Sequence, residues 1–193
     1  MTTPYTIPNL LTGLRIALIP VIVGVFYIPN GVGDVVAGLL FMVAGITDSL
    51  DGYIARRTGM VSPLGEFLDP VADKLMVAAA LVLIVSRNPV WYVTLTAAII
   101  IGREIAISAL REWMAEIGAR RKVAVSSLGK FKTVAQIVGL TMMLYHQPLL
   151  GLPLYWIGLG LTVVAAMLTL WSMLGYLQAA WPDLMGKTPQ NRT

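Results

Sequence analysis

The chain alternates between long apolar runs and short polar breaks. The apolar runs cover residues 9–28, 35–55, 70–86, 90–110, 131–147 and 153–180. Each approaches or exceeds the roughly 17 residues that a membrane-spanning helix needs. The breaks carry Pro, Gly or Asn, as at 28–31 and 87–89, which are typical turn residues. The pattern predicts an all-α integral membrane protein with six transmembrane helices.

Composition supports a membrane protein. Hydrophobic residues make up 57% of the 193 residues and charged residues 12%, whereas a soluble domain carries about 25% charged residues. We expect one six-helix transmembrane domain over 1–182 and a flexible C-terminal tail over 183–193. The start of the chain has no basic leader with a small-residue cleavage site, so we expect its first apolar run to be a retained span.

The positive charges predict how the spans are oriented. Of the 14 Lys and Arg residues, all but Arg87 fall on or near one side when the spans alternate in direction. By the positive-inside rule that side is cytosolic, and both termini lie on it. The net charge of +4 suits an anionic membrane surface or phosphate-bearing substrates. Nucleic acid is not expected as a partner, because the cations are interleaved with apolar spans.

Two aspartate pairs stand out against this apolar background. Asp48 and Asp51 are three residues apart, and Asp69 and Asp73 are four apart, so each pair presents its carboxylates on one helical face. The short segment 57–68 predicts an antiparallel pair of helices whose acidic faces oppose each other at the cytosolic end. Ionisable groups at membrane depth are costly, and their retention indicates a function.

A cluster of carboxylates calls for a cation. The chain has no cysteine and one histidine, so a thiolate site is excluded and an oxygen site is favoured, which selects Mg²⁺ or Mn²⁺. Four carboxylates are enough to bridge two metals about 3.5 to 4 Å apart, an arrangement that acts on phosphoryl groups. The alternative is a cation transporter that uses the aspartates as its ion path.

The residues between the pairs fit a diphosphate ligand. Gly52 and Gly65 have no side chain to block approach to the backbone, although small residues also serve helix packing. Arg56 follows Gly52 by one helical turn, so its guanidinium could bind phosphate oxygens of the same ligand. The alternative for Arg56 is a cytosolic anchor.

Written out, residues 48–73 match a known signature. They read DSLDGYIARRTGMVSPLGEFLD followed by PVAD, which is D-x2-D-G-x2-A-R-x8-G-x3-D-x3-D without a mismatch. This resembles the signature of the CDP-alcohol phosphotransferase family. Segments outside the signature are also similar to bacterial members of the family, so the resemblance covers nearly the whole chain: Asn9 to Thr12 with Arg15, 102–104, 109–113 and 125–133.

The resemblance implies a fold and a set of site residues. The fold would be a six-helix, usually dimeric membrane protein of the bacterial cytoplasmic membrane, with an active-site cavity open to the cytosol. Asp73 would act as the base that takes a proton from the hydroxyl of the acceptor substrate, in addition to binding metal. Two divalent ions would be held by Asp48, Asp51, Asp69 and Asp73, and the CDP moiety by Gly52, Arg56, Gly65, Asn9 and Thr12.

The resemblance also implies a reaction. A phosphatidyl group would pass from CDP-diacylglycerol to sn-glycerol 3-phosphate, giving phosphatidylglycerol phosphate and CMP. An acceptor with its own phosphate needs further cations, and we expect these to be Arg103, Arg111 and Lys130. For each of the three, the alternative is cytosolic anchoring or pairing with Glu104 and Glu112. Serine, inositol or a phospholipid as acceptor remains open, and serine would not need these cations.

Overall fold

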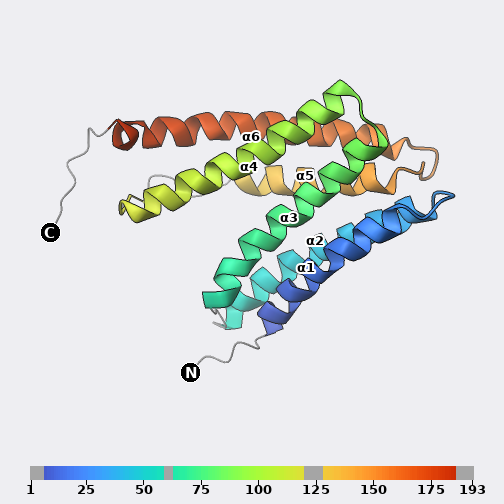
Figure 1. Cartoon of the computed structure of the whole chain (residues 1–193), viewed down its shortest axis with the longest axis horizontal. Coiled ribbons are helices and arrows are strands. Elements are labelled where there is room, and N and C mark those ends of the chain that lie inside the picture. Colours follow the sequence, from blue (N-terminus) through green and yellow to red (C-terminus); the bar gives the residue numbers. More distant parts are fainter. Residues whose placement is uncertain (1–6, 59–62, 120–127, 186–193) are drawn as a thin grey trace.

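The computed structural model describes residues 7–58, 63–119 and 128–185. This part of the chain forms six α-helices and no β-strand, which confirms the predicted all-helical fold with six helices (Figure 1). The helices are α1 Ile7–Phe26, α2 Val32–Thr58, α3 Pro63–Arg87, α4 Trp91–Glu116, α5 Leu128–Tyr145 and α6 Leu154–Leu184.

Tight turns explain why neighbouring helices run antiparallel. Asn30 and Gly31, between α1 and α2, have φ angles of 65° and 74°. Gly151 between α5 and α6 has a φ of 79°. This left-handed region is open to glycine and tolerated by asparagine. The turn residues that divide the sequence into apolar runs therefore reverse the chain in the structure.

Helix α1 is the common packing partner of the two helices that carry the aspartates. It packs against both α2 and α3, and among the described residues α2 packs mainly on α1 and α5. The predicted antiparallel α2–α3 pair is therefore joined largely through α1. Helix α2 also packs closely on α5, because Gly38 and Gly45 have no side chain to hold the helices apart. A Cβ on Gly38 would lie 2.8 Å from Tyr145 Cα.

Three helices are long and apolar enough to cross a membrane within the described residues. They are α1 over Asn9–Phe26, α4 and α6. Helix α3 falls outside this class, since charged residues such as Asp69, Asp73 and Lys74 interrupt its apolar sequence. The structure thus supports a membrane protein, and spanning by α2, α3 and α5 stays a prediction. In Figure 1 the start of α1 and the ends of α2, α4 and α6 lie at the same end of the molecule.

An ion pair closes the opposite end of the first three helices. Arg87 Nη1, at the end of α3, lies 2.5 Å from Oδ1 of buried Asp34, near the start of α2. The Arg87 guanidinium also lies 4.5 Å from the centre of the Phe26 ring and donates to the Phe26 carbonyl. Arg87 is the one cation that the sequence analysis assigned to the other side of the membrane. Its partner Asp34 is buried, and a buried carboxylate requires such a cation.

Helices α5 and α6 meet backbone to backbone. A Cβ on Gly139 would lie 2.5 Å from Thr162 Oγ1 and 2.8 Å from the Gly158 carbonyl oxygen. A Cβ on Gly158 would in turn lie 2.6 Å from the Gly139 carbonyl oxygen. Small residues allow this approach, which is a common way of packing helices in membranes.

Replacing Gly139 by leucine is expected to destabilise the protein by about 1–3 kcal/mol, because the side chain has no room beside α6. Thermal unfolding of the purified protein in detergent measures the change. Gly160→Leu is the control, since no atom lies within 4 Å of a Cβ at that position. Equal melting temperatures for the two variants would show that the glycine contact is dispensable.

Candidate active site

One face of α1 carries buried polar residues. Asn9, Thr12 and Arg15 follow at helical spacing, and their residues are 9%, 0% and 2% exposed. Arginine is rarely so deeply buried without a partner of opposite charge. These residues therefore point to a polar interior site between α1 and its neighbours.

The partners are the aspartates of α2 and α3. The Thr12 hydroxyl donates to Asp69 Oδ1 at 2.5 Å. Arg15 Nη1 lies 2.5 Å from Asp48 Oδ1 and 2.6 Å from Asp73 Oδ1. One turn of α1 thus faces one turn of α3, which confirms that Asp69 and Asp73 share a helical face. Asp48 reaches the same point from α2.

Several predicted site residues lie beyond this description. The side chains of Asp51, Arg56 and Lys130 and the surroundings of Gly52 are outside the described residues. Their roles stay predictions. Gly65 is buried near the start of α3. Within the described residues, no three His, Asp or Glu side chains form a metal-binding group.

The described aspartates nevertheless fit a hard divalent cation. One oxygen from Asp48 and one from Asp73 converge on a single nitrogen atom, so both can reach one positive centre. Their donors are carboxylate oxygens, which suit Mg²⁺ and Mn²⁺ rather than softer metals. Asp48 and Asp73 are 31% and 47% exposed, so an ion has access to both.

A cavity adjoins the Asp48–Asp73 pair. It measures about 80 Å³, and its wall on the α5 side includes Thr133 and Gln136. An apolar groove of about 880 Å³ runs along α2 and α5 beside it. Gly45 and Ile137 line both spaces. The carboxylates therefore sit where a small cavity, with Arg15, Thr133 and Gln136 in its wall, meets an apolar groove, a surface suited to an amphipathic ligand.

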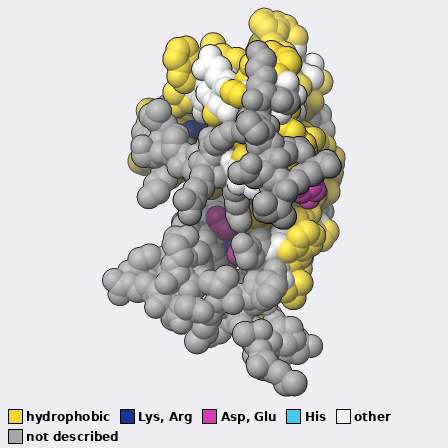
Figure 2. Space-filling model, turned by 90° about the vertical axis from the view of Figure 1, so that its left-hand side faces the viewer, with side chains coloured by type: hydrophobic (Ala, Val, Ile, Leu, Met, Phe, Trp, Pro, Cys, Tyr) yellow, Lys and Arg dark blue, Asp and Glu magenta, His cyan; other side chains and the backbone are white. Residues whose placement is uncertain are grey.

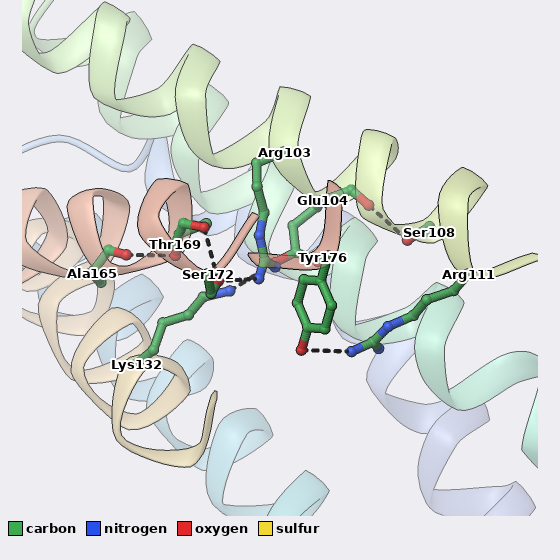
Figure 3. A network of polar contacts seen from close by, with 9 residues as sticks. All are labelled: Arg103, Glu104, Ser108, Arg111, Lys132, Ala165, Thr169, Ser172 and Tyr176. Atoms are coloured by element: carbon green, nitrogen blue, oxygen red, sulfur yellow. Dashed lines mark hydrogen bonds and ion pairs between the residues drawn. The ribbon is translucent and has the colours of Figure 1, made fainter. Parts of the chain in front are cut away.

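A second polar cluster lies between α4, α5 and α6 (Figure 3). Arg103 Nη1 donates to Glu104 Oε1 at 2.7 Å, and its Nη2 donates to the Ser172 hydroxyl at 3.2 Å. Lys132 Nζ lies 3.5 Å from the same Glu104 oxygen. Arg111 Nη2 donates to the Tyr176 hydroxyl at 3.3 Å. We call Arg103, Glu104, Arg111, Lys132, Ser172 and Tyr176 the cationic cluster.

The cationic cluster carries more positive charge than its own carboxylate balances. The cluster contains three cations and one acid, Glu104, which pairs with Arg103 and Lys132, and the side chains of these two cations are each 9% exposed. The Nε atoms of Arg103 and Arg111 are buried and have no hydrogen-bond partner among the described residues. Such an excess of buried donors suits an anion that accepts several hydrogen bonds.

Lys132 lies in the cationic cluster but was not among the residues expected from the sequence. The expected lysine was Lys130, two positions earlier on α5. Residues two apart on a helix point in very different directions, so the choice depends on how α5 faces α4. Polar Thr133 and Gln136 on the same helix, both lining the carboxylate cavity, are the signal that this stretch faces inward.

The two sites lie toward the same end of the molecule. Figure 2 views the end at which α2 and α4 terminate, and acidic side chains are visible near its centre with a basic side chain above them. Helix α5 connects the sites, since Thr133 lines the carboxylate cavity while neighbouring Lys132 joins the cationic cluster. The arrangement can hold a cation and an anion side by side.

Comparison with known proteins gives the family. Residues 5–174 match the CDP-alcohol phosphatidyltransferase family. A Salmonella choleraesuis protein and an Escherichia coli K12 protein, both named CDP-diacylglycerol–glycerol-3-phosphate 3-phosphatidyltransferase, are each 52% identical over 94% of this chain and 98% of the relative. A Shigella flexneri protein of the same name is 51% identical over the same shares. This chain therefore belongs to the CDP-alcohol phosphatidyltransferase family of enzymes.

Proposed function

We propose that this enzyme transfers the phosphatidyl group of CDP-diacylglycerol to sn-glycerol 3-phosphate, giving phosphatidylglycerol phosphate and CMP. The observation that carries the proposal is the 52% identity, over nearly the whole chain, to relatives named for this reaction. Family membership also favours a transferase over the cation transporter considered from the sequence.

The aspartates are proposed to hold two divalent ions, Mg²⁺ or Mn²⁺. Bound there, the ions would neutralise charge that develops on the departing CMP. Asp48 and Asp73 support this role because their oxygens converge on one point. Asp69 lies on the same face of α3 as Asp73 and is held by Thr12. Asp51 completes the proposed ligand set.

Asp73 is proposed to accept the proton of the attacking glycerol hydroxyl. The hydroxyl oxygen then bonds to the lipid-side phosphorus, and the bond to CMP breaks. Asp73 lines the cavity beside Gln136 and is partly exposed, so an acceptor could reach it. Binding of the CDP moiety is proposed for Gly52, Arg56, Gly65, Asn9 and Thr12.

The cationic cluster is proposed to bind the phosphate of glycerol 3-phosphate. Arg103, Arg111 and Lys132 offer N–H donors and excess positive charge, with Lys130 as a further candidate. Helix α5 holds Lys132 beside the wall of the carboxylate cavity, which would place the acceptor hydroxyl toward Asp73. Serine has no phosphate, so as an acceptor it would not require this cluster.

The apolar groove is proposed to hold an acyl chain of the lipid substrate. It adjoins the carboxylates through Gly45 and Ile137, so a diphosphate at the acids would leave a chain beside α2 and α5. The enzyme is proposed to act as a homodimer in the bacterial cytoplasmic membrane, with all six helices spanning it and the site open to the cytosol.

An acceptor panel tests the proposal. Purified enzyme is incubated with CDP-diacylglycerol, Mg²⁺ or Mn²⁺, and glycerol 3-phosphate, serine or inositol, and released CMP is measured. We expect release with glycerol 3-phosphate alone and its loss when the metal is chelated. Release with serine or inositol instead would identify a different acceptor, and no release with any acceptor would contradict the enzyme assignment.

A further inference from the structure

Arg15 is a buried cation placed between two carboxylates. Its Nη1 lies 2.5 Å from Asp48 Oδ1 and 2.6 Å from Asp73 Oδ1, and its side chain is 2% exposed. We propose that Arg15 competes with the divalent metal for these two aspartates and thereby sets the metal affinity of the site. This inference rests on the metal-dependent reaction proposed above.

Competition follows from the distances. A Mg²⁺ ion binds carboxylate oxygens at about 2.0–2.1 Å, so an ion shared by Asp48 and Asp73 needs the space that the guanidinium nitrogen occupies. Two cations on the same oxygens also repel each other strongly where little water is present. The ion and the guanidinium therefore exclude each other from the two oxygens that Arg15 contacts.

The Arg15 guanidinium can leave the two carboxylate oxygens without a movement of α1. Thr12, one turn earlier on α1, is bonded to Asp69 and fixes this part of α1 on α3. The cavity of about 80 Å³ beside Arg15 is lined by Asp48, Asp73 and Gln136. The long arginine side chain can change its rotamer to release the two oxygens while the backbone of α1 stays in place.

If Arg15 had a purely structural role, its replacement would change the metal affinity in the opposite direction. If Arg15 only joined α1 to α2 and α3, its loss would loosen the carboxylates and weaken metal binding, because second-shell partners that orient ligands usually strengthen affinity. Competition predicts tighter binding once the charge is gone. The sign of the change in affinity therefore separates the two roles.

The test measures Mn²⁺ binding to purified protein in detergent without substrates. The electron paramagnetic resonance signal of free Mn²⁺ reports how much of the ion is bound. Arg15→Met removes the charge and keeps an unbranched side chain, and we expect its Kd for Mn²⁺ to fall about tenfold, the scale on which groups around a metal tune its affinity. Arg15→Lys keeps a charge that reaches less far, and a smaller decrease is expected.

Lys74→Met is the matched control. It removes a positive charge next to Asp73 in sequence, yet Lys74 makes no ion pair with Asp48 or Asp73 in the described structure. Its Kd should stay near that of the wild type. An unchanged or larger Kd in Arg15→Lys, or in folded Arg15→Met, overturns the competition. Wild-type protein that binds no Mn²⁺ overturns the metal proposal itself.

Discussion

Asp73→Asn is expected to lower the rate of CMP release by about a thousandfold, since a positioned general base contributes about 10² to 10⁴ to a rate. The amide cannot take the proton from the glycerol hydroxyl, and it is a poorer metal ligand than a carboxylate. It retains the oxygen that accepts the bond from Arg15 Nη1 at 2.6 Å. Turnover under saturating substrates, with protein quantity matched by gel filtration, measures the effect.

Asp34→Asn serves as the control at the other end of the same helices. Asp34 is buried and paired with Arg87, so its replacement should lower the melting temperature and leave the rate per folded molecule close to that of the wild type. Asp73→Asn should abolish almost all turnover with a smaller loss of melting temperature, because Arg15 keeps Asp48 as a charged partner. Retained activity in Asp73→Asn would contradict its role as base.

Lys132→Met is expected to raise the KM for glycerol 3-phosphate about tenfold or more, because a lost charge-assisted hydrogen bond costs about 1.5–3 kcal/mol. The kcat should change less, since the phosphate is remote from the reacting bond and its binding is alike in ground and transition states. The KM for CDP-diacylglycerol should stay constant. Initial rates over a range of each substrate give all three constants.

Glu104→Gln tests the same site by removing its negative charge instead of a positive one. Glu104 accepts from Arg103 at 2.7 Å and lies 3.5 Å from Lys132 Nζ, so it competes with a phosphate for both cations. Neutralising it should leave the KM for glycerol 3-phosphate equal or lower. If Lys132→Met and Glu104→Gln raised this KM alike, the cluster would be a structural network and not an anion site.

Much of the fold could be predicted because a bilayer demands long apolar helices. The predicted run 70–86 lies inside α3, and 35–55 lies inside α2. Helix α3 begins seven residues before its run, at the end where its aspartates lie, and α2 exceeds its run by three residues at each end. Hydropathy detects the apolar part of a helix and misses turns made of polar residues. The six-helix count needed only the turn residues between the runs.

The site was predictable in part. Spacing alone placed Asp69 and Asp73 on one face, because helical geometry fixes it. The role of α1 was not readable, since nothing in the spacing of Thr12 and Arg15 states which helix they will meet. Lys132 was missed for the same reason. Contacts between helices depend on how each is rotated, and a single sequence does not report that rotation.

Helix α5 has a further consequence for the choice of acceptor. Thr133 faces the carboxylate cavity and its neighbour Lys132 faces the cationic cluster, so one rigid segment fixes the spacing between the two. An acceptor that uses both must span that spacing between its hydroxyl and its phosphate. Under the proposed binding, this fixed spacing would favour acceptors whose hydroxyl and phosphate are separated by a matching number of carbon atoms.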